Sequence, residues 1–344
     1  MTPIVRSLLE TDLYKFTMWQ ALMHSHPSAQ SEYAFACRNR TAYPLAELKE
    51  DVERELDHLC SLSFAAAEIA YLRGLRFIKS DFADLLELFR FRRRFITVGT
   101  SGDDLTIQIA GPHVHVMGFE IYVLYIINEL YFRRFDQQAA LAEGRARLAA
   151  KIALLRAKAG QLERRHPFEC FDFGVRRRFS GAWHEEVVAT LAREVPEYFK
   201  GTSNVYLAMK YKLVPIGTMA HEYMQSYQGF GVRLRDFQKA ALEGWVQEYR
   251  GDLGTALTDV VGMDAFLADF DLYFAKLFDT CEWTVWTRNH ECTDPWTKRR
   301  NYRRACVGKA RKVIRLPREK CGVSKTGPSL RPQFSVFQGR SDHA

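Results

Sequence analysis

The sequence predicts an α/β protein, in which a mixed N-terminal domain precedes a parallel barrel or open sheet of alternating strands and helices. Three observations favour this fold. From about residue 168, short apolar stretches alternate with helical patterns, which is typical of successive βα units. Polar motifs follow three of these stretches, at the strand ends where the loops of a barrel share one face. Before residue 136, strand-like and helical spacings are interspersed, as in a mixed domain.

Residues 1–135 form the predicted N-terminal domain. Its helix over 8–23 is opened by Thr11 and Asp12, and a second helix over 47–62 carries one apolar stripe. The predicted strands are 33–37, 89–95, and a hairpin of 97–99 with 105–109 joined by Ser101-Gly102-Asp103. The arginine-rich segment 89–95 is interpreted as a strand with one buried face, rather than as a nucleic-acid surface.

Two features of this domain have both a functional and a structural interpretation. His113 and His115 would lie on one face of a strand, but a metal site needs three or four donors. No third ligand is near in sequence, so we interpret the pair as structural. The apolar run 121–127 is too short to span a bilayer, so it is interpreted as a buried element and no membrane association is expected.

Residues 136–279 form the predicted barrel domain. It opens with an Ala-rich helix over 136–165, which stops at His166-Pro167. The expected strands are 168–173, 198–201, 214–217 and 256–260, and the expected helices are 187–191, 204–211, 221–227 and 264–278.

Charge separates the C-terminal segment from the rest of the 344-residue chain. The chain has 49 Lys and Arg against 41 Asp and Glu, a formal net charge of +8. Residues 280–344 contain 15 basic and 5 acidic side chains, which leaves 34 and 36 for residues 1–279. The body therefore carries no indication of a nucleic-acid partner. Its three scattered cysteines and the lack of an export signal fit a cytoplasmic protein.

Residues 280–344 are interpreted as a basic tail that begins at Thr280, and two explanations are open. One is an arm that binds RNA or a membrane surface. The other is a shifted reading frame or an alternative end, which would produce a disordered segment. Because charge, cysteine and tryptophan usage all change at one residue, the second explanation is favoured. The four tail cysteines lack the close C-x-x-C spacing of zinc sites.

The segment Gly217-Thr218-Met219-Ala220-His221-Glu222 is the most informative motif. It follows the apolar stretch 213–216 at the mouth of a βα connection, where a histidine can act as a nucleophile. A Gly-Thr pair lets backbone N–H groups approach a phosphate, and the start of the next helix adds positive potential. The structural alternative is a histidine that caps a helix or lies in the core.

Together with four further motifs, this segment makes the sequence resemble nicotinate phosphoribosyltransferase, the ATP-using enzyme of NAD salvage that joins nicotinate to phosphoribosyl pyrophosphate. The other motifs are residues 8–15, 172–178, 201–204, and 256–259 with 263–266. The resemblance runs from the N-terminus to about Asp279. It implies an incomplete βα barrel like that of type II phosphoribosyltransferases, with a smaller mixed domain.

The resemblance also implies how the substrates would be bound. Tyr14 would stack on the nicotinate ring, reaching across from the second subunit of a homodimer, and Thr218 would contact the ring. Arg176 and Arg177 would bind the carboxylate or the phosphates, with Phe173 packing nearby. The phosphate-binding residues would be Gly201, Thr202, Ser203, Asn204 and Gly217.

The same resemblance gives His221 the central catalytic role. This histidine would accept the γ-phosphate of ATP and so drive the step that releases pyrophosphate. Glu222 is one possible holder of its ring, and Asp259 would help to hold Mg²⁺ bound to nucleotide or pyrophosphate.

One departure from the family pattern bears on activity. The family continues past this point with an arginine and an Asp-Ser-Gly-Asp segment, neither of which is found in its expected place here. We therefore expect the family's activity, impaired in this chain by its altered C-terminal part. The alternatives are an enzyme that acts on nicotinamide, or a catalytically dead member kept as a binding subunit.

Overall fold

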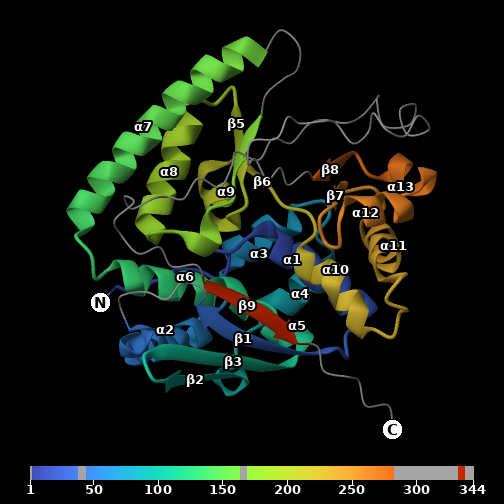
Figure 1. Cartoon of the computed structure of the whole chain (residues 1–344), viewed down its shortest axis with the longest axis horizontal. Coiled ribbons are helices and arrows are strands. Elements are labelled where there is room, and N and C mark those ends of the chain that lie inside the picture. The colour runs from blue at the N-terminus through green and yellow to red at the C-terminus, as the bar shows by residue number, and fades with distance from the viewer. Residues whose placement is uncertain (1, 38–43, 163–168, 283–331, 338–344) are drawn as a thin grey trace. The chain divides into compact units, whose positions relative to one another are not determined.

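Residues 2–37, 44–162, 169–282 and 332–337 are described by the structure, which is a computed structural model (Figure 1). They belong to two compact units. The first unit comprises residues 1–216 with 319–344, and the second comprises residues 217–318. None of the helices in these described ranges is long and apolar enough to cross a membrane.

A four-stranded sheet of order β2-β3-β1-β9 forms one layer of the first unit. Its strands are β1 (Gln30–Cys37), β2 (Ile96–Ser101), β3 (Asp104–Pro112) and β9 (Pro332–Phe337). The predicted hairpin is confirmed, because β2 and β3 pair antiparallel with Ser101 opposite Asp104. Gly102 at the turn has a φ of +58°, a conformation that glycine adopts at little cost. Side chains of β3 alternate between buried and exposed, so one face of the sheet supplies core residues.

Helices pack against this sheet and against one another in the same unit (Figure 1). They are α1 (Leu13–Ser25), α2 (Lys49–Ser61), α3 (Ala66–Arg73), α4 (Ser80–Leu88), α5 (His113–Val116) and α6 (Phe119–Phe132), with 3-10 turns η1 (Leu45–Leu48) and η2 (Arg93–Phe95). The apolar run 121–127 lies within α6, and every residue of that run is buried. The stripe predicted on 47–62 is also confirmed, because Leu48, Val52, Leu56 and Leu59 are fully buried.

Three parallel strands continue the first unit, in the order β4-β5-β6. They are β4 (Cys170–Asp172), β5 (Phe199–Thr202) and β6 (Val214–Pro215), and the associated helices are α7 (Gln137–Leu162), α8 (Gly181–Glu194) and α9 (Val205–Tyr211), with the turn η3 (Val175–Arg177). Ile152 and Leu155 of α7 pack with Val188 of α8 and Phe199 of β5 in one apolar cluster. The strand-then-helix alternation and the parallel pairing confirm the predicted α/β class.

The second unit repeats the alternation on a smaller scale. Its elements are α10 (His221–Ser226), η4 (Tyr227–Gly229), α11 (Phe237–Tyr249), β7 (Thr255–Leu257), α12 (Met263–Asp269), α13 (Leu272–Leu277) and β8 (Thr280–Glu282). β7 and β8 pair in parallel. Tyr223, Tyr227 and Trp245 are buried in edge-to-face contacts between α10, η4 and α11, which supply much of the core of this unit.

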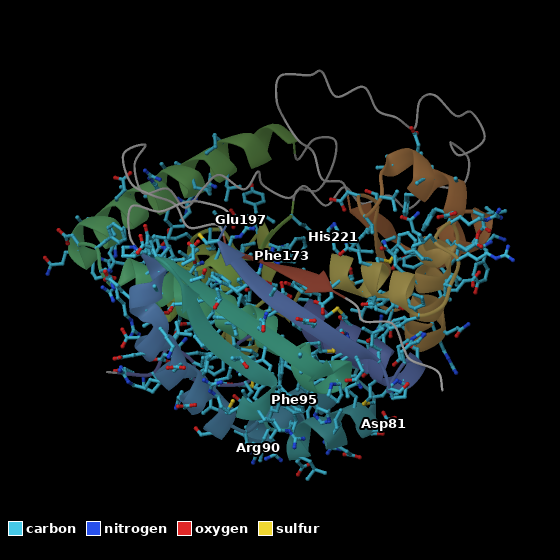
Figure 2. All side chains as sticks on the ribbon, turned by 60° about the horizontal axis from the view of Figure 1, so that its bottom comes forward. Asp81, Arg90, Phe95, Phe173, Glu197 and His221 are labelled. Carbon is cyan, nitrogen blue, oxygen red and sulfur yellow. The ribbon has the colours of Figure 1, made fainter. Side chains whose placement is uncertain are left out.

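Several sequence expectations were wrong in detail. The first helix begins at Leu13 rather than at residue 8. Residues 89–95 are not a strand: Phe89 and Phe91 are buried and Arg90 is only half-buried (Figure 2), but no neighbouring strand pairs with the described backbone there. The alternation of apolar and basic residues in 89–95 therefore reflects alternating burial of side chains, without hydrogen bonding to a neighbouring strand. The expected helix 264–278 is two helices, because the Asp271 carboxylate caps α13 by accepting from the backbone N–H of Tyr273 at 2.9 Å.

The two histidines of the Gly111-Pro112 region lie in the short helix α5 instead of a strand. His113 is buried and its Nδ1 is hydrogen-bonded to the Ser31 hydroxyl, while His115 stacks on Phe89 and Phe95. Burial, followed by the charge of Lys15, lowers the pKa of His113 to about 3, so its ring is neutral at physiological pH. The structural interpretation of His113 agrees with this environment.

Most of the predicted tail lies outside the described residues. The described parts of 280–344 are β8, which pairs with β7, and β9, which pairs antiparallel with β1. The origin of the tail stays a prediction. Three helices of the body were not predicted from the sequence: α3, α4 and α11.

Candidate active site

Asp172, the last residue of β4, connects three segments of the first unit. Its Oδ2 accepts hydrogen bonds from His184 Nε2 and from the Thr202 hydroxyl, both at 2.7 Å, and its Oδ1 accepts from the Gly174 N–H at 3.0 Å. Its backbone carbonyl accepts from the Ser203 N–H at 2.8 Å. Burial alone would raise the pKa of Asp172, but the His184 ring and these hydrogen bonds hold it below its ordinary value. Asp172 is therefore an ionised and largely buried anchor.

The segment Gly201 to Asn204 ends β5 and is held from within the protein. The Thr202 hydroxyl donates to Asp172 and accepts from the Asn204 N–H at 3.1 Å, and the Ser203 hydroxyl donates to the Asp12 carboxylate. Asn204 is fully buried and caps α9 through its side-chain oxygen. Its Nδ2 has no hydrogen-bond partner among the described residues. Several donors expected to bind phosphate thus already serve the fold, and Asn204 Nδ2 is the side-chain donor that remains for a ligand.

A cluster of charged and phenolic groups lies around Arg176, which is in η3. The guanidinium Nη1 is 3.4 Å from Glu120 Oε1, and the other oxygen of Glu120 is 2.6 Å from Lys15 Nζ. Tyr14 and Asp12 of the same chain also lie close enough to raise the pKa of Arg176, with Tyr14 contributing most. Burial raises the pKa of both Tyr14 and Asp12, and their side chains are hydrogen-bonded to each other. The structure therefore brings together Tyr14 and Arg176, two of the residues singled out in the sequence.

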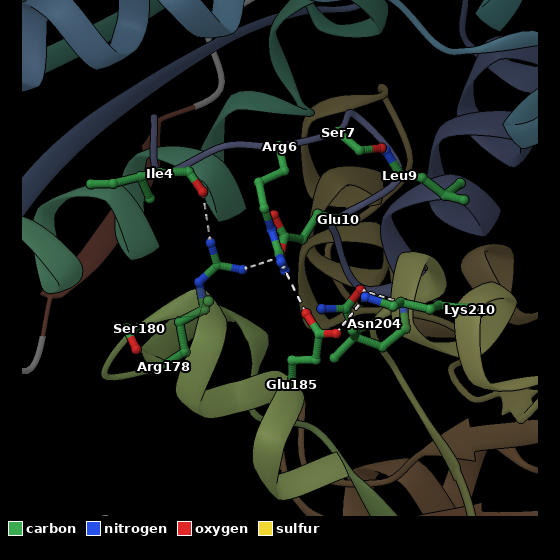
Figure 3. A network of polar contacts seen from close by, with 12 residues as sticks. Ile4, Arg6, Ser7, Leu9, Glu10, Arg178, Ser180, Glu185, Asn204 and Lys210 are labelled. Atoms are coloured by element: carbon green, nitrogen blue, oxygen red, sulfur yellow. Dashed lines mark hydrogen bonds and ion pairs between the residues drawn. The ribbon is translucent and has the colours of Figure 1, made fainter. Parts of the chain in front are cut away.

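The neighbouring Arg178 holds this segment through buried contacts. It was not singled out as a site residue from the sequence. Its side chain is 1% exposed and pairs with Glu10 at 2.8 Å, while its Nη2 donates to the Ile4 carbonyl at 3.2 Å (Figure 3). The guanidinium also lies 3.8 Å from the centroid of the Tyr125 ring. Burial would raise the pKa of Glu10, but Arg178 and Arg6 hold it below its ordinary value. Arg178 thus fixes the backbone that presents Arg176.

Phe173 and Arg177 complete the predicted substrate segment. Phe173 is 37% exposed, which is unusual for a large aromatic side chain and is consistent with a ring that contacts a ligand (Figure 2). Arg177 is half-buried at the end of η3. The roles of Phe173 and Arg177 toward the carboxylate or the phosphates stay predictions.

His221 and Asp259 form a close pair in the second unit. His221 Nε2 is 2.8 Å from Asp259 Oδ1, and the two side chains are 46% and 34% exposed. In the prediction from the sequence, Glu222 was one possible holder of this ring and Asp259 was a metal ligand. Adjacent residues on a helix point in directions about 100° apart, so Glu222 is poorly placed to face the His221 ring. The partner of the ring that the structure shows is Asp259.

Gly217 and Thr218 lie just before α10. Gly217 has a φ of +152°, which residues with side chains rarely adopt, so a glycine is required to turn the chain here. The Thr218 hydroxyl donates to the Thr255 carbonyl at 3.0 Å, which connects this loop to β7. The helix that follows is only six residues long, so its dipole contributes less to anion binding than the sequence suggested. The loop geometry, rather than the helix, distinguishes this site.

Two family models match this chain. The model of the nicotinate phosphoribosyltransferase (NAPRTase) family matches residues 168–281, and the model of the N-terminal domain of that family matches residues 9–128. The first match contains Asp172, Asn204, His221 and Asp259, and the second contains Tyr14.

Individual relatives show the same likeness. A nicotinate phosphoribosyltransferase of Herminiimonas arsenicoxydans is 74% identical over 279 residues, which cover 81% of this chain and 70% of the relative. One of Chromobacterium violaceum is 57% identical over 322 residues, covering 91% and 78%. The crystal structure of the Vibrio cholerae enzyme superimposes with a TM-score of 0.74 at 32% identity, covering 83% of this chain and 68% of that chain. The Porphyromonas gingivalis structure gives 0.71 at 32% identity, covering 89% and 74%. The chain belongs to the nicotinate phosphoribosyltransferase family.

Proposed function

We propose that this protein forms nicotinate mononucleotide from nicotinate and phosphoribosyl pyrophosphate, in the salvage route to NAD. The family match over both parts of the body is the observation that carries this proposal. In the reaction the pyridine nitrogen of nicotinate forms a bond to the ribose C1. The bond from C1 to the pyrophosphate oxygen breaks, and pyrophosphate leaves with the electron pair.

The first unit would bind the two substrates of this reaction. Arg176 and Arg177 present guanidinium groups suited to the nicotinate carboxylate or to a phosphate. Tyr14 and Phe173 offer aromatic faces for the pyridine ring, and Tyr14 would do so beside Arg176 of its own chain rather than from a second subunit. Asn204 Nδ2, which is buried and has no described partner, would donate to a phosphate or ribose oxygen.

Thr218 and the loop at Gly217 would add contacts to the ring and to the phosphates. The φ of Gly217 keeps the backbone clear of a Cβ, so an anion can approach the N–H groups closely.

ATP would drive the reaction through His221. With Nε2 held by the Asp259 carboxylate at 2.8 Å, the lone pair of Nδ1 is left to attack the γ-phosphorus of ATP. The bond from the γ-phosphorus to the bridging oxygen breaks, and ADP leaves. Water later cleaves the phosphohistidine and releases phosphate. Asp259 also stabilises the positive charge that the ring acquires when Nδ1 is phosphorylated.

Mg²⁺ fits this arrangement as an ion held mainly by the substrates. Among the described residues, no three His, Cys, Asp or Glu side chains come together as a metal cage. Mg²⁺ commonly keeps several waters and binds through one or two carboxylates plus phosphate oxygens, so Asp259 would supply at most one ligand. The ion would neutralise phosphate charge on ATP and pyrophosphate.

Labelling with γ-³²P-ATP tests the role of His221 directly. We expect acid-labile, alkali-stable label in the wild type, none in His221→Asn, and slower labelling in Asp259→Asn. His26→Asn, which changes a histidine at the end of α1, is the matched control and should label like the wild type. ³¹P NMR of the labelled protein should show phosphate on Nδ1 rather than on Nε2. Undiminished labelling of His221→Asn would refute the phosphohistidine at this position.

Product formation tests the activity itself. Purified protein is incubated with nicotinate or nicotinamide, phosphoribosyl pyrophosphate, ATP and Mg²⁺, and mononucleotide is measured by chromatography. We expect nicotinate mononucleotide as the product and stimulation by ATP, at a lower turnover than that of relatives with the Asp-Ser-Gly-Asp segment. Nicotinamide mononucleotide as the main product, or binding of substrates without any turnover, would favour one of the two alternatives.

A further inference from the structure

The Glu120 carboxylate in the first turn of α6 is shared between two cations. Lys15 Nζ contacts one oxygen at 2.6 Å, and Arg176 Nη1 contacts the other at 3.4 Å. By the ratio of these distances, the attraction to Lys15 is about 1.3 times the attraction to Arg176 in the same dielectric. The Lys15 side chain is 2% exposed, whereas that of Arg176 is 31% exposed. Of the two cations, Arg176 is therefore the one that a ligand can reach.

Burying the Lys15 ammonium group costs hydration free energy, and packing of its side chain alone does not account for a lysine at this position. A buried ion pair often contributes no more stability than apolar residues of the same shape, because two charges lose their hydration. Lys15 lies on α1 directly after Tyr14, and its partner Glu120 also contacts Arg176. The pair is therefore better explained by its effect on the neighbouring Arg176.

Consider the charges in this cluster when Lys15 is absent. Glu120 would then lose the nearer of these two cations, and its carboxylate would offset more of the charge of Arg176. The net charge of the cluster is one unit more positive with Lys15 than without it, whether or not Asp12 is protonated. His113 faces Lys15 and is neutral, and Tyr14 is a neutral phenol at physiological pH. Lys15 therefore makes the electrostatic potential around the accessible Arg176 more positive.

We propose that Lys15 is a specificity-determining positioning residue, which pairs with Glu120 and so leaves the charge of Arg176 available to an anionic substrate group. The anion is the nicotinate carboxylate or a phosphate of phosphoribosyl pyrophosphate. This inference rests on the proposed function. It explains how the site would prefer a carboxylate over the neutral amide of nicotinamide although an acidic side chain touches the arginine.

A charge-neutral double variant separates this proposal from a purely structural salt bridge. Lys15→Met leaves Glu120 to neutralise Arg176, so anion binding should fall. Lys15→Met combined with Glu120→Gln removes both charges, so the charge of Arg176 should become available again and anion binding should recover. Lys15→Arg keeps the charge and should resemble the wild type. A structural bridge predicts the opposite for the double variant, which would stay impaired.

Binding is measured by calorimetry with nicotinate, nicotinamide and ribose 5-phosphate, on full-length proteins whose folding is checked by circular dichroism. For Lys15→Met we expect affinity for the relevant anion to fall about 10- to 100-fold, as for a lost charge-assisted contact. Affinity for nicotinamide should change by less than about threefold, and the double variant should regain anion affinity to within about threefold of the wild type. The anion that loses affinity, nicotinate or ribose 5-phosphate, identifies the group that Arg176 binds.

The outcomes distinguish this inference from the proposed function. Equal losses for the anions and for nicotinamide, or no recovery in the double variant, would overturn the role of Lys15. So would a wild type that binds neither anion more tightly than nicotinamide. If Lys15→Met does not fold, the test uses the double variant alone. A double variant that no longer binds the anion more tightly than nicotinamide then overturns the proposal. A wild type that binds nicotinate with the predicted pattern but makes no mononucleotide refutes the proposed function and leaves this inference standing.

Discussion

Replacing Asp172 by asparagine should destabilise the first unit far more than its conservative shape suggests. The two carboxylate oxygens accept from three donors, which belong to His184, Thr202 and Gly174. An asparagine side chain has one acceptor oxygen and one NH₂ group. If the amide oxygen replaces Oδ2, the NH₂ group faces the Gly174 N–H; in the other orientation it faces His184 and Thr202, which can accept only after the His184 ring changes its tautomer and the Thr202 hydroxyl turns.

The magnitude follows from the lost interactions. A hydrogen bond to a charged group contributes about 1.5–3 kcal/mol, and a buried donor left without an acceptor costs about 1–3 kcal/mol. We therefore expect the free energy of unfolding to fall by about 3–5 kcal/mol, against a total of about 5–15 kcal/mol for a typical domain. The variant should fold, but with a lower midpoint in urea.

Urea denaturation at pH 7, followed by circular dichroism, measures this loss. Asp84→Asn is the matched control, because Asp84 pairs with Arg73 at 2.6 Å but its side chain is 61% exposed. An exposed pair of this kind contributes about 0–1 kcal/mol. If Asp172→Asn costs no more than Asp84→Asn, the account of Asp172 as a buried anchor is wrong.

The pH dependence gives a second check on the same residue. The pKa of Asp172 is lowered in the folded state, so the carboxylate stabilises the protein above its unfolded pKa of about 3.9. That contribution is lost as the pH falls through the folded pKa. The difference in stability between the wild type and Asp172→Asn should therefore be constant from pH 7 to 5 and shrink below about pH 4. A difference that disappears already between pH 7 and 6 would point to another titrating group.

Three further predictions concern the same unit. Thr202→Val removes a donor to Asp172 and an acceptor, and should cost about 1–3 kcal/mol in urea, whereas Thr202→Ser should cost less; equal losses would contradict the hydroxyl's role. In Gly201→Ala, the new Cβ would lie 2.1 Å from the Val214 carbonyl oxygen, so β5 and β6 must separate. We expect a loss of about 1–3 kcal/mol or more, and an unchanged melting temperature would refute the close approach. The folded pKa of His113, about 3, lies below its unfolded value, so acid favours the unfolded state. Between pH 7 and 5.5 the wild type should lose about 1 kcal/mol more stability than His113→Gln, and parallel curves would exclude this.

Local patterns in the sequence were sufficient for much of the fold. The apolar stripe of α2, the hairpin around Gly102 and the alternation from β4 to α10 depend on residues close together in the chain, and all were predicted. The errors occur where distant residues decide the outcome. Residues 89–95 have the spacing of a strand, but a strand also needs a neighbour to pair with, and spacing does not reveal one.

The candidate site was predicted as a set of residues but not as a set of contacts. Tyr14, Arg176 and His221 were found because motifs carry them. Glu120 lies 56 positions from its partner Arg176 and carried no motif, and Asp259, 38 positions from His221, was expected to hold a metal ion rather than the ring. His184 could not have been found, because nothing in α8 distinguishes a histidine that holds a buried carboxylate from one on the surface.

If His221 is phosphorylated as proposed, ATP coupling is a linkage between phosphorylation of His221 and binding of phosphoribosyl pyrophosphate. Linkage is reciprocal: if phosphorylation of His221 changes the affinity for phosphoribosyl pyrophosphate by some factor, that ligand must change the phosphorylation equilibrium by the same factor. Typical couplings lie between about 5- and 150-fold. Calorimetry with and without ATP gives the first factor, and the occupancy of labelled His221 at fixed ATP and ADP, with and without ligand, gives the second. Two factors close to one would show that phosphorylation of His221 does not change the affinity for the ligand, and the energetic role proposed for it would then fail.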